Sequence, residues 1–386
     1  MFLASTFATV RGMSNRGATP SIEAWWREWA LAIAVVMLTL ALLGRSWISA
    51  ALSQPALLVI LLVVLCGVIL TAAIAVVRHA DELAHRLGEP LGTLLLTLAI
   101  TGLEVTMVAF VMSTGHAKPA LARDTMFAVV MLVLNGFLGL ALVLGGLRHH
   151  EQHFNLQSAN AFLLLILPLT VLGLVLPNYT HATPGPILSK FQMLFLSLMS
   201  VGIYAVFLFV QNRRHRGFFT MLETAGEPAE PVAHSQHSTL YHAVMLGLYG
   251  LPLVLLAEQM AAPLDAMADQ LNAPPALSGL IMGVLVLTPE AIAAIRAALA
   301  NHLQRSVNIL LGSVLASIGL TIPLVIALSL TTGRVLVLGL GPTETVMLLL
   351  TLVTSMLTFS LPRTNLLPGC VHLLLFGAYL MLLFDR

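Results

Sequence analysis

Two glutamates stand inside apolar stretches of this chain. Glu104 lies in "TLAITGLEVTMVAF" (97–110), and Glu290 lies in "GVLVLTPEAIAAI" (283–295). A charge at the centre of a bilayer costs on the order of a few kcal/mol even on the most lenient scales, so such residues usually have a function. The alternative is a structural hydrogen bond between helices. Two glutamates in matched settings favour a site that binds cations or protons.

A residue that weakens helices precedes each glutamate: Gly102 in "TGLE" and Pro289 in "LTPE". We expect each helix to be interrupted there and to restart near its glutamate, where free N–H groups stabilise a carboxylate. Carbonyls freed by the break and the hydroxyls of Thr101 and Thr288 would complete a set of oxygen ligands. Such a set suits hard cations such as calcium or sodium.

The span after each glutamate carries further polar residues. "RDTMFAVVMLVLNGFLG" (123–139) aligns with "RSVNILLGSVLASIGLT" (305–321). Positions eleven residues apart lie within about 20° of each other on a helix, so each span is expected to present a polar stripe that supports the site. The stripe residues are Asp124 and Asn135 in the first span and Ser306, Ser313 and Ser317 in the second.

Competition between cations and protons predicts antiport. Two carboxylates can be neutralised by one divalent cation or by protons, and a neutral site crosses a low-dielectric path more easily than a charged one. We therefore expect a secondary antiporter that exports calcium in exchange for protons, without a cofactor. A sodium or potassium/proton antiporter on the same scaffold is the alternative.

Two other classes fit the sequence less well. An intramembrane metalloprotease needs HExxH, which is absent. An aspartyl intramembrane protease needs paired membrane aspartates, whereas the deep acids here are single glutamates, so no enzyme is expected. A channel usually builds its pore from oligomer symmetry, whereas this site would lie within one chain. The pattern leaves the oligomeric state open.

The composition indicates that the main partner of this chain is a lipid bilayer. The 386 residues are 58% hydrophobic and 9% charged, with a mean hydropathy of +0.95, whereas soluble proteins are about one quarter charged. A net charge of +1 does not predict a basic surface for binding nucleic acid.

Hydropathy predicts an all-α membrane protein with about eleven transmembrane helices, because a span needs roughly 20 apolar residues. The expected spans are 28–44, 55–77, 90–112, 125–147, 160–177, 188–211, 239–260, 275–299, 306–332, 343–361 and 365–384.

The two glutamates suggest an internal repeat. Each would belong to a unit of five spans, and an odd number of spans inverts the second unit in the membrane, as in many transporters with interrupted helices at the midplane. The expected division is an N-terminal tail (1–27), a first helix and loop (28–54), one repeat (55–211), a linker (212–238) and a second repeat (239–386).

The basic residues predict the orientation. With the N-terminus inside, twelve of the 18 Lys and Arg residues fall on the inner side and six on the outer side. The N-terminus, the C-terminal side of the second span and the linker are therefore expected in the cytoplasm.

Two cytoplasmic segments carry more charge than the rest. "RHADELAHRLGEP" (78–90) is interpreted as a loop in which Asp81, Glu82 and Glu89 gather cations at the entrance, with a plain solvated loop as the alternative. The linker region holds His234, His237 and His242, which leaves a metal or pH sensor as an alternative to a plain flexible linker.

Around Glu104 and Glu290 and in residues 77–90, the sequence resembles bacterial calcium/proton antiporters of the ChaA type, in the cation/calcium exchanger superfamily. The likeness runs from about residue 55 to the C-terminus, and "VRHADELAHRLGEP" (77–90) is specific to that branch. It implies eleven spans, two inverted five-span repeats, and one essential acid per repeat at Glu104 and Glu290. It also implies cation efflux driven by protons across a bacterial inner membrane.

The sequence departs from the superfamily at three positions near the glutamates. Many relatives have Gly-Asn-x-x-Glu before each acid, but here Thr101 and Leu287 occupy the asparagine positions. Many also have a histidine after the second glutamate, where this chain has Ala291. The departures bear on the ligands beyond the glutamates and on the choice among calcium, sodium and potassium.

Deletion of residues 220–235 should leave ion transport intact. This part of the linker, which includes "ETAGEPAEPVA", is rich in Pro, Glu and Ala and has no apolar periodicity. The measurement is ion flux in everted vesicles, with a Gly/Ser segment of equal length as the control. A deletion that inserts normally but no longer transports would make the linker regulatory.

Overall fold

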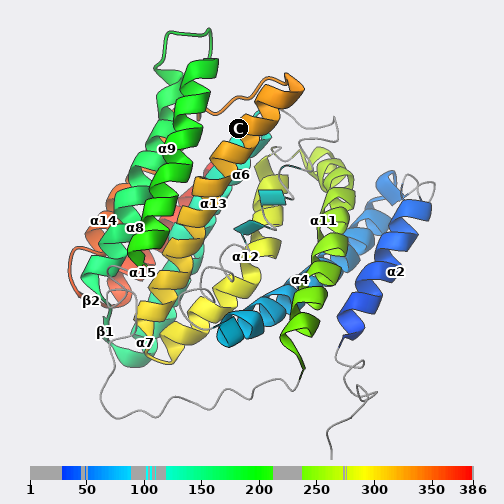
Figure 1. The fold of residues 1–386 in the computed structure, drawn as a ribbon, viewed down its shortest axis with the longest axis horizontal. Coiled ribbons are helices and arrows are strands. Elements are labelled where there is room, and N and C mark those ends of the chain that lie inside the picture. The colour runs from blue at the N-terminus through cyan, green and yellow to red at the C-terminus, as the bar shows by residue number, and fades with distance from the viewer. Residues whose placement is uncertain are drawn as a thin grey trace, which may run out of the picture.

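The computed structural model describes residues 28–44, 48, 51–87, 101–102, 105–106, 109, 119–211, 237–272, 274 and 276–384. Over these residues the protein is almost entirely helical, which confirms the expected all-α membrane fold (Figure 1). Eight helices are long and apolar enough to cross a membrane, and two shorter apolar helices accompany them.

The described helices match ten of the eleven expected spans, and the span 90–112 lies largely outside the described residues. The helical elements are α2 (Trp29–Leu43), α4 (Pro55–Leu87), α6 (Leu121–Val130), η1 (Met131–Phe137), α7 (Leu138–His149), α8 (Leu156–Thr170), η2 (Val171–Val175), η3 (Leu176–Asn178), α9 (Lys190–Phe209), α11 (Thr239–Gln270), α12 (Ala276–Leu299), α13 (Leu303–Thr332), α14 (Pro342–Thr358) and α15 (Leu366–Phe384).

Helix ends follow local sequence signals. Ser189 begins α9 with a capping box in which its hydroxyl and the side chain of Gln192 satisfy each other's backbone N–H groups. Gly333 ends α13 with a φ of 70°, which glycine adopts without strain. A two-stranded antiparallel pair, β1 (Gln152–His153) with β2 (Arg363–Thr364), joins the end of α7 to the start of α15.

Two helices extend further than hydropathy suggests. α4 continues to Leu87 and α11 to Gln270, although both ends carry charged residues. The interpretation of 78–90 as a loop is therefore wrong for residues 78–87, which form the last turns of α4. Charged side chains are compatible with a helix that extends beyond the apolar layer, and hydropathy cannot detect such an extension.

The described helices form two large hydrophobic cores, and Ala257 and Val286 form a third, small cluster. α2, α4 and α11 share the smaller core, and α11 packs against α4 more extensively than any other described pair of helices. α6 to α9 and α13 to α15 form the larger core. α12 contributes Leu285 to the smaller core and Leu287, Ala294 and Ala298 to the larger one, so it stands between them (Figure 1).

Replacing Gly369 by alanine should destabilise the larger core. A Cβ atom at this buried position in α15 would lie 2.7 Å from the backbone nitrogen of Val143 and 2.9 Å from the carbonyl oxygen of Gly139 in α7. Overpacking of this kind costs about 1–3 kcal/mol. The measurement is the melting temperature of the purified protein in detergent.

The control is Gly377→Ala in the same helix, where a Cβ atom would meet nothing within 4 Å. Alanine favours a helix over glycine by about 0.5–1 kcal/mol, so this variant should be unchanged or more stable. Equal melting temperatures for the two variants would contradict the close approach of α7 and α15.

Candidate ion-binding site

α12 places Glu290 against α13. The side chain of Glu290 is half-buried, and Ser313 of α13 donates a hydrogen bond from its hydroxyl to Glu290 Oε2 at 2.5 Å. Among the predicted supporting residues, Ser313 is thus in direct contact with Glu290.

The expected helix restart at Glu290 is wrong. α12 is helical without a break from Ala276 to Leu299, and Pro289 lies inside it. Packing on both sides holds the helix together, and the proline removes one bond instead of ending the helix. Because proline has no N–H, the carbonyl of Leu285 loses its usual helical partner. The Thr288 hydroxyl donates to the carbonyl of Val284 in its own helix.

The serine stripe of α13 is buried. Ser306 is 0% exposed, and its hydroxyl has no hydrogen-bond partner within the described part of the chain. Ser317, one turn beyond Ser313, is 1% exposed. The stripe thus lines the inside of the bundle over several turns, with Ser313 at the level of Glu290.

The first glutamate, Glu104, lies outside the described residues, and so does Glu89. Near Glu104 in the sequence, Thr101 is helical and buried. The carbonyl of Gly102 accepts a hydrogen bond from the Thr106 hydroxyl at 2.6 Å. The predicted pairing of Glu104 with Glu290 therefore stays a prediction.

Asp124 and Asn135 share a face, as predicted, but that face does not meet α12. Asp124 forms an ion pair with Arg123 at 2.7 Å and lines a 30 Å³ cleft with Glu344 of α14 and Tyr379 of α15. Thr125 lies beside Gly279 of α12 instead. The sequence could predict the stripe, but not which neighbours would pack against it.

Asn135 belongs to a buried polar chain between η1, α14 and α15. Its amide nitrogen donates to the Thr351 hydroxyl at 2.7 Å, and its oxygen lies 3.0 Å from His372 Nδ1. The Thr358 hydroxyl lies 3.0 Å from His372 Nε2. His372 was missed in the sequence, although a histidine within an apolar run, with threonines seven residues apart on the preceding helix, was a usable signal.

Two of the three predicted entrance residues, Asp81 and Glu82, lie on the last turns of α4. Asp81 is exposed, and Glu82 pairs with Arg86 one turn later at 3.0 Å. An ion pair with a neighbouring arginine neutralises Glu82 locally, which weakens its expected role in gathering cations.

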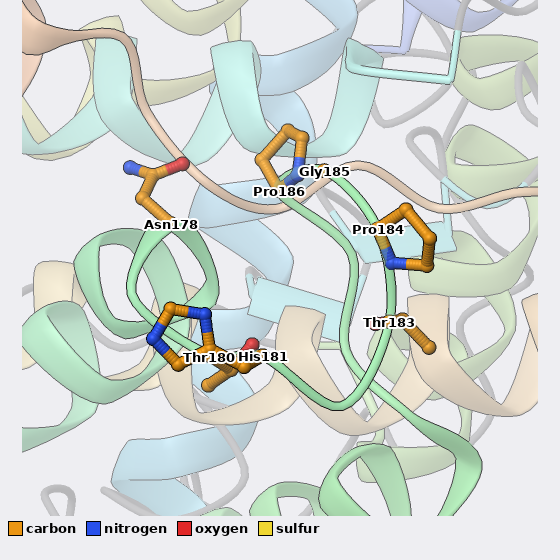
Figure 2. Close-up of a pocket in the computed structure, with 7 residues that line it drawn as sticks. All are labelled: Asn178, Thr180, His181, Thr183, Pro184, Gly185 and Pro186. Carbon is orange, nitrogen blue, oxygen red and sulfur yellow. The ribbon is translucent and has the colours of Figure 1, made fainter.

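One cavity of the described part of the chain is not lined by Glu290. A cavity of about 490 Å³ lies in the loop between η3 and α9, around Asn178, His181 and Pro186 (Figure 2). Its lining residues include no carboxylate, so it lacks the charge that would hold a cation.

The arrangement around Glu290 supplies oxygen atoms of two kinds: its own carboxylate and the Ser313 hydroxyl. Within the described ranges, no group of three or more His, Cys, Asp or Glu residues converges to hold a metal. Glu290 can hold a proton or contribute one carboxylate ligand to a hard cation.

Comparisons with known proteins agree with this chemistry. The family described as "Sodium/calcium exchanger protein" matches residues 57–212 and 241–384. The chain is 38% identical over 375 residues to the sodium-potassium/proton antiporter ChaA of Escherichia coli strain K12, and the match covers 96% of this chain and 100% of that relative.

Solved structures share the fold. The Ca²⁺/H⁺ antiporter protein YfkE matches with a TM-score of 0.70 at 18% identity, over 93% of this chain and 100% of that one. The H⁺/Ca²⁺ exchanger CAX matches with a TM-score of 0.60 at 18% identity, over 92% of this chain and 88% of that one.

Proposed function

Because this chain belongs to the sodium/calcium exchanger protein family, we propose that Glu290 and Glu104 form one site that binds a cation or protons in competition. The chain is a multi-pass membrane transporter that exchanges cations, as its relatives are, and its relatives are antiporters rather than enzymes. The proposal assigns the exchange to named carboxylates.

The observation that carries the proposal is the position of Glu290. Glu290 is half-buried, accepts a hydrogen bond from Ser313, and lies on the helix that stands between the two hydrophobic cores. A small shift of one core against the other would expose this carboxylate alternately to the two sides of the membrane. The cation and the protons can then use the same pathway through the protein.

The coupling follows from charge. With a cation bound, the carboxylates are ionised and neutralised by it; with protons bound, they are neutral acids. The empty site carries uncompensated charge, which the apolar surroundings disfavour during reorientation. Each reorientation therefore carries either the cation or the protons. The Ser313 hydroxyl can coordinate the cation through its oxygen or donate a hydrogen bond to the carboxylate.

We propose calcium as the exported cation, with sodium or potassium as the second candidate. Two carboxylates give the site a charge that one divalent ion balances, and YfkE and CAX are named as calcium/proton exchangers. The sodium-potassium/proton antiporter is the observation that favours the second candidate, because it is 38% identical to this chain.

The proposal also includes two inverted five-span repeats, 55–211 and 239–386, joined by the linker 212–238 after the first helix. The separate family matches at 57–212 and 241–384 support this division. We place the N-terminus in the cytoplasm and the protein in the bacterial inner membrane, supported by the basic residues and by the bacterial relative.

Glu290→Gln and Glu104→Gln should each abolish exchange while the protein still inserts and purifies. Glutamine keeps the shape of the side chain but can neither ionise nor release a proton. The measurement is proton flux in proteoliposomes after calcium, sodium, potassium or magnesium is added singly, which also ranks the cations.

Two further variants calibrate this test. Ser313→Ala should weaken cation binding by about tenfold without abolishing transport, because a hydrogen bond to a charged group contributes about 1.5–3 kcal/mol. Glu151→Gln, at an exposed glutamate 3.8 Å from Arg363, should transport normally. Normal cation-driven flux in Glu290→Gln or in Glu104→Gln would sink the two-carboxylate mechanism.

The apparent cation affinity should rise with pH. Protons occupy the carboxylates at low pH and must leave before the cation binds, so transport falls as the cytoplasmic side is acidified. Below the titration midpoint, each displaced proton changes the affinity by about tenfold per pH unit.

The measurement is the half-saturating cation concentration between about pH 6 and pH 9. A slope of two indicates that both glutamates release protons, and a slope of one indicates a single exchanged proton. A flat profile would show that the protons are carried elsewhere.

A further inference from the structure

A buried polar cluster joins three helices at one face of the membrane. It lies where α2 begins, where α4 ends and where α11 begins. At its centre is Glu28, which is 8% exposed and directly precedes α2. Its carboxylate accepts hydrogen bonds from Arg78 at 2.8 and 2.9 Å, from Tyr241 at 3.0 Å and from Tyr249 at 2.7 Å.

Glu28 is a fixed negative charge in this cluster. Burial alone would raise the pKa of Glu28, but the hydrogen bond from Tyr249 and the charge of Arg78 outweigh it and hold that pKa below its ordinary value. The carboxylate therefore remains ionised over the range in which histidines titrate, and the groups in the cluster that can change charge near neutral pH are imidazoles.

Two of these imidazoles face each other between α4 and α11. His79 Nδ1 lies 2.9 Å from His242 Nδ1, and the two residues are 1% and 4% exposed. A hydrogen bond needs one N–H and one lone pair, so a single hydrogen lies between these two nitrogen atoms. His79 Nε2 lies 3.4 Å from Glu28 Oε2 and 3.3 Å from Arg78 Nη2.

The arrangement tolerates one additional proton but not two. One charged ring can still donate from Nδ1 to the neutral ring, and Glu28 partly balances its charge. When both rings are charged, both Nδ1 atoms carry hydrogen, so two N–H groups would meet at 2.9 Å. The two imidazolium rings would also lie beside the positively charged Arg78. The contact between α4 and α11 must then open.

The charged and titratable groups around the pair come from every helix of the cluster. They are Glu28 before α2, Arg78, Glu82 and Arg86 on α4, Tyr241 and Tyr249 on α11, and His237 just before α11.

We propose that His79 and His242 form a second proton-binding site, separate from Glu290, whose full protonation loosens the packing of α2 and α11 against α4. The consequence reaches the transport machinery because these three helices share the smaller core, and α12 inserts Leu285 into it. Acid on this face would thus change how the smaller core sits against the helix that carries Glu290. The inference does not depend on which cation is transported.

The test is hydrogen–deuterium exchange of the full chain in lipid nanodiscs, followed by mass spectrometry, between about pH 4 and pH 8. The range extends well below the ordinary histidine value because two buried rings beside Arg78 protonate less readily than a free imidazole. After correction for intrinsic exchange, the start of α2 and the facing ends of α4 and α11 should exchange about tenfold faster at the acid end in the wild type. His242→Asn, which can still donate or accept a hydrogen bond but cannot ionise, should remove this acid step.

His181→Asn is the matched control, because His181 lies in the loop between η3 and α9, away from the cluster (Figure 2). It should behave as the wild type. No acid step in the wild type, or the same step in His242→Asn, would overturn the proposal.

A second measurement covers the case in which His242→Asn loosens the helices at every pH. Nitrogen-15 spectra of the histidine-labelled wild type should show one shared Nδ1–H at the alkaline end and two imidazolium rings at the acid end. Rings that stay neutral while exchange accelerates would also overturn the proposal.

Discussion

Glu290 lies on a helix whose lipid surroundings offer its carboxylate no hydrogen-bond donor, so its polar partners must come from inside the protein. The nearest one is the Ser313 hydroxyl across the interface between α12 and α13. That contact places the carboxylate at the interface between α12 and α13, on the helix that borders both hydrophobic cores. Ions can reach a site at such a boundary from either side of the membrane after a small shift of one core against the other. A site enclosed within one core would not become accessible in this way.

The same constraint has two different solutions elsewhere in the bundle. His372 lies between the Thr358 hydroxyl and the Asn135 amide oxygen, so both ring nitrogens have neutral partners and the ring has no reason to change charge. His79 and His242 instead share one hydrogen next to an ionised glutamate and an arginine. The first arrangement fixes three helices in place, whereas the second holds them only while the pair carries fewer than two extra protons.

The sequence predicts the spans well because hydropathy depends on lipid contact, which every span has. It fails where neighbours decide. Residues 78–87 look like a loop because they are charged, yet they continue α4, where Arg78 and His79 meet Glu28. Pro289 looks like a helix end, yet helix packing on both sides keeps α12 continuous. The face that Asp124 and Asn135 share is predictable from periodicity, but its orientation toward α14 and α15 is not.

Protons can therefore act on this fold in two ways that differ in kind. In the proposed exchange a proton replaces a cation at Glu290, so its effect depends on how much cation is present. At His79 and His242 a proton replaces nothing; it adds charge to a helix contact, and its effect is the same whatever the cation concentration. The first effect shifts an affinity, and the second shifts the packing of the helices that border α12. If both operate, raising the cation concentration restores transport lost to protonation of Glu290 but not transport lost to opening of the histidine pair.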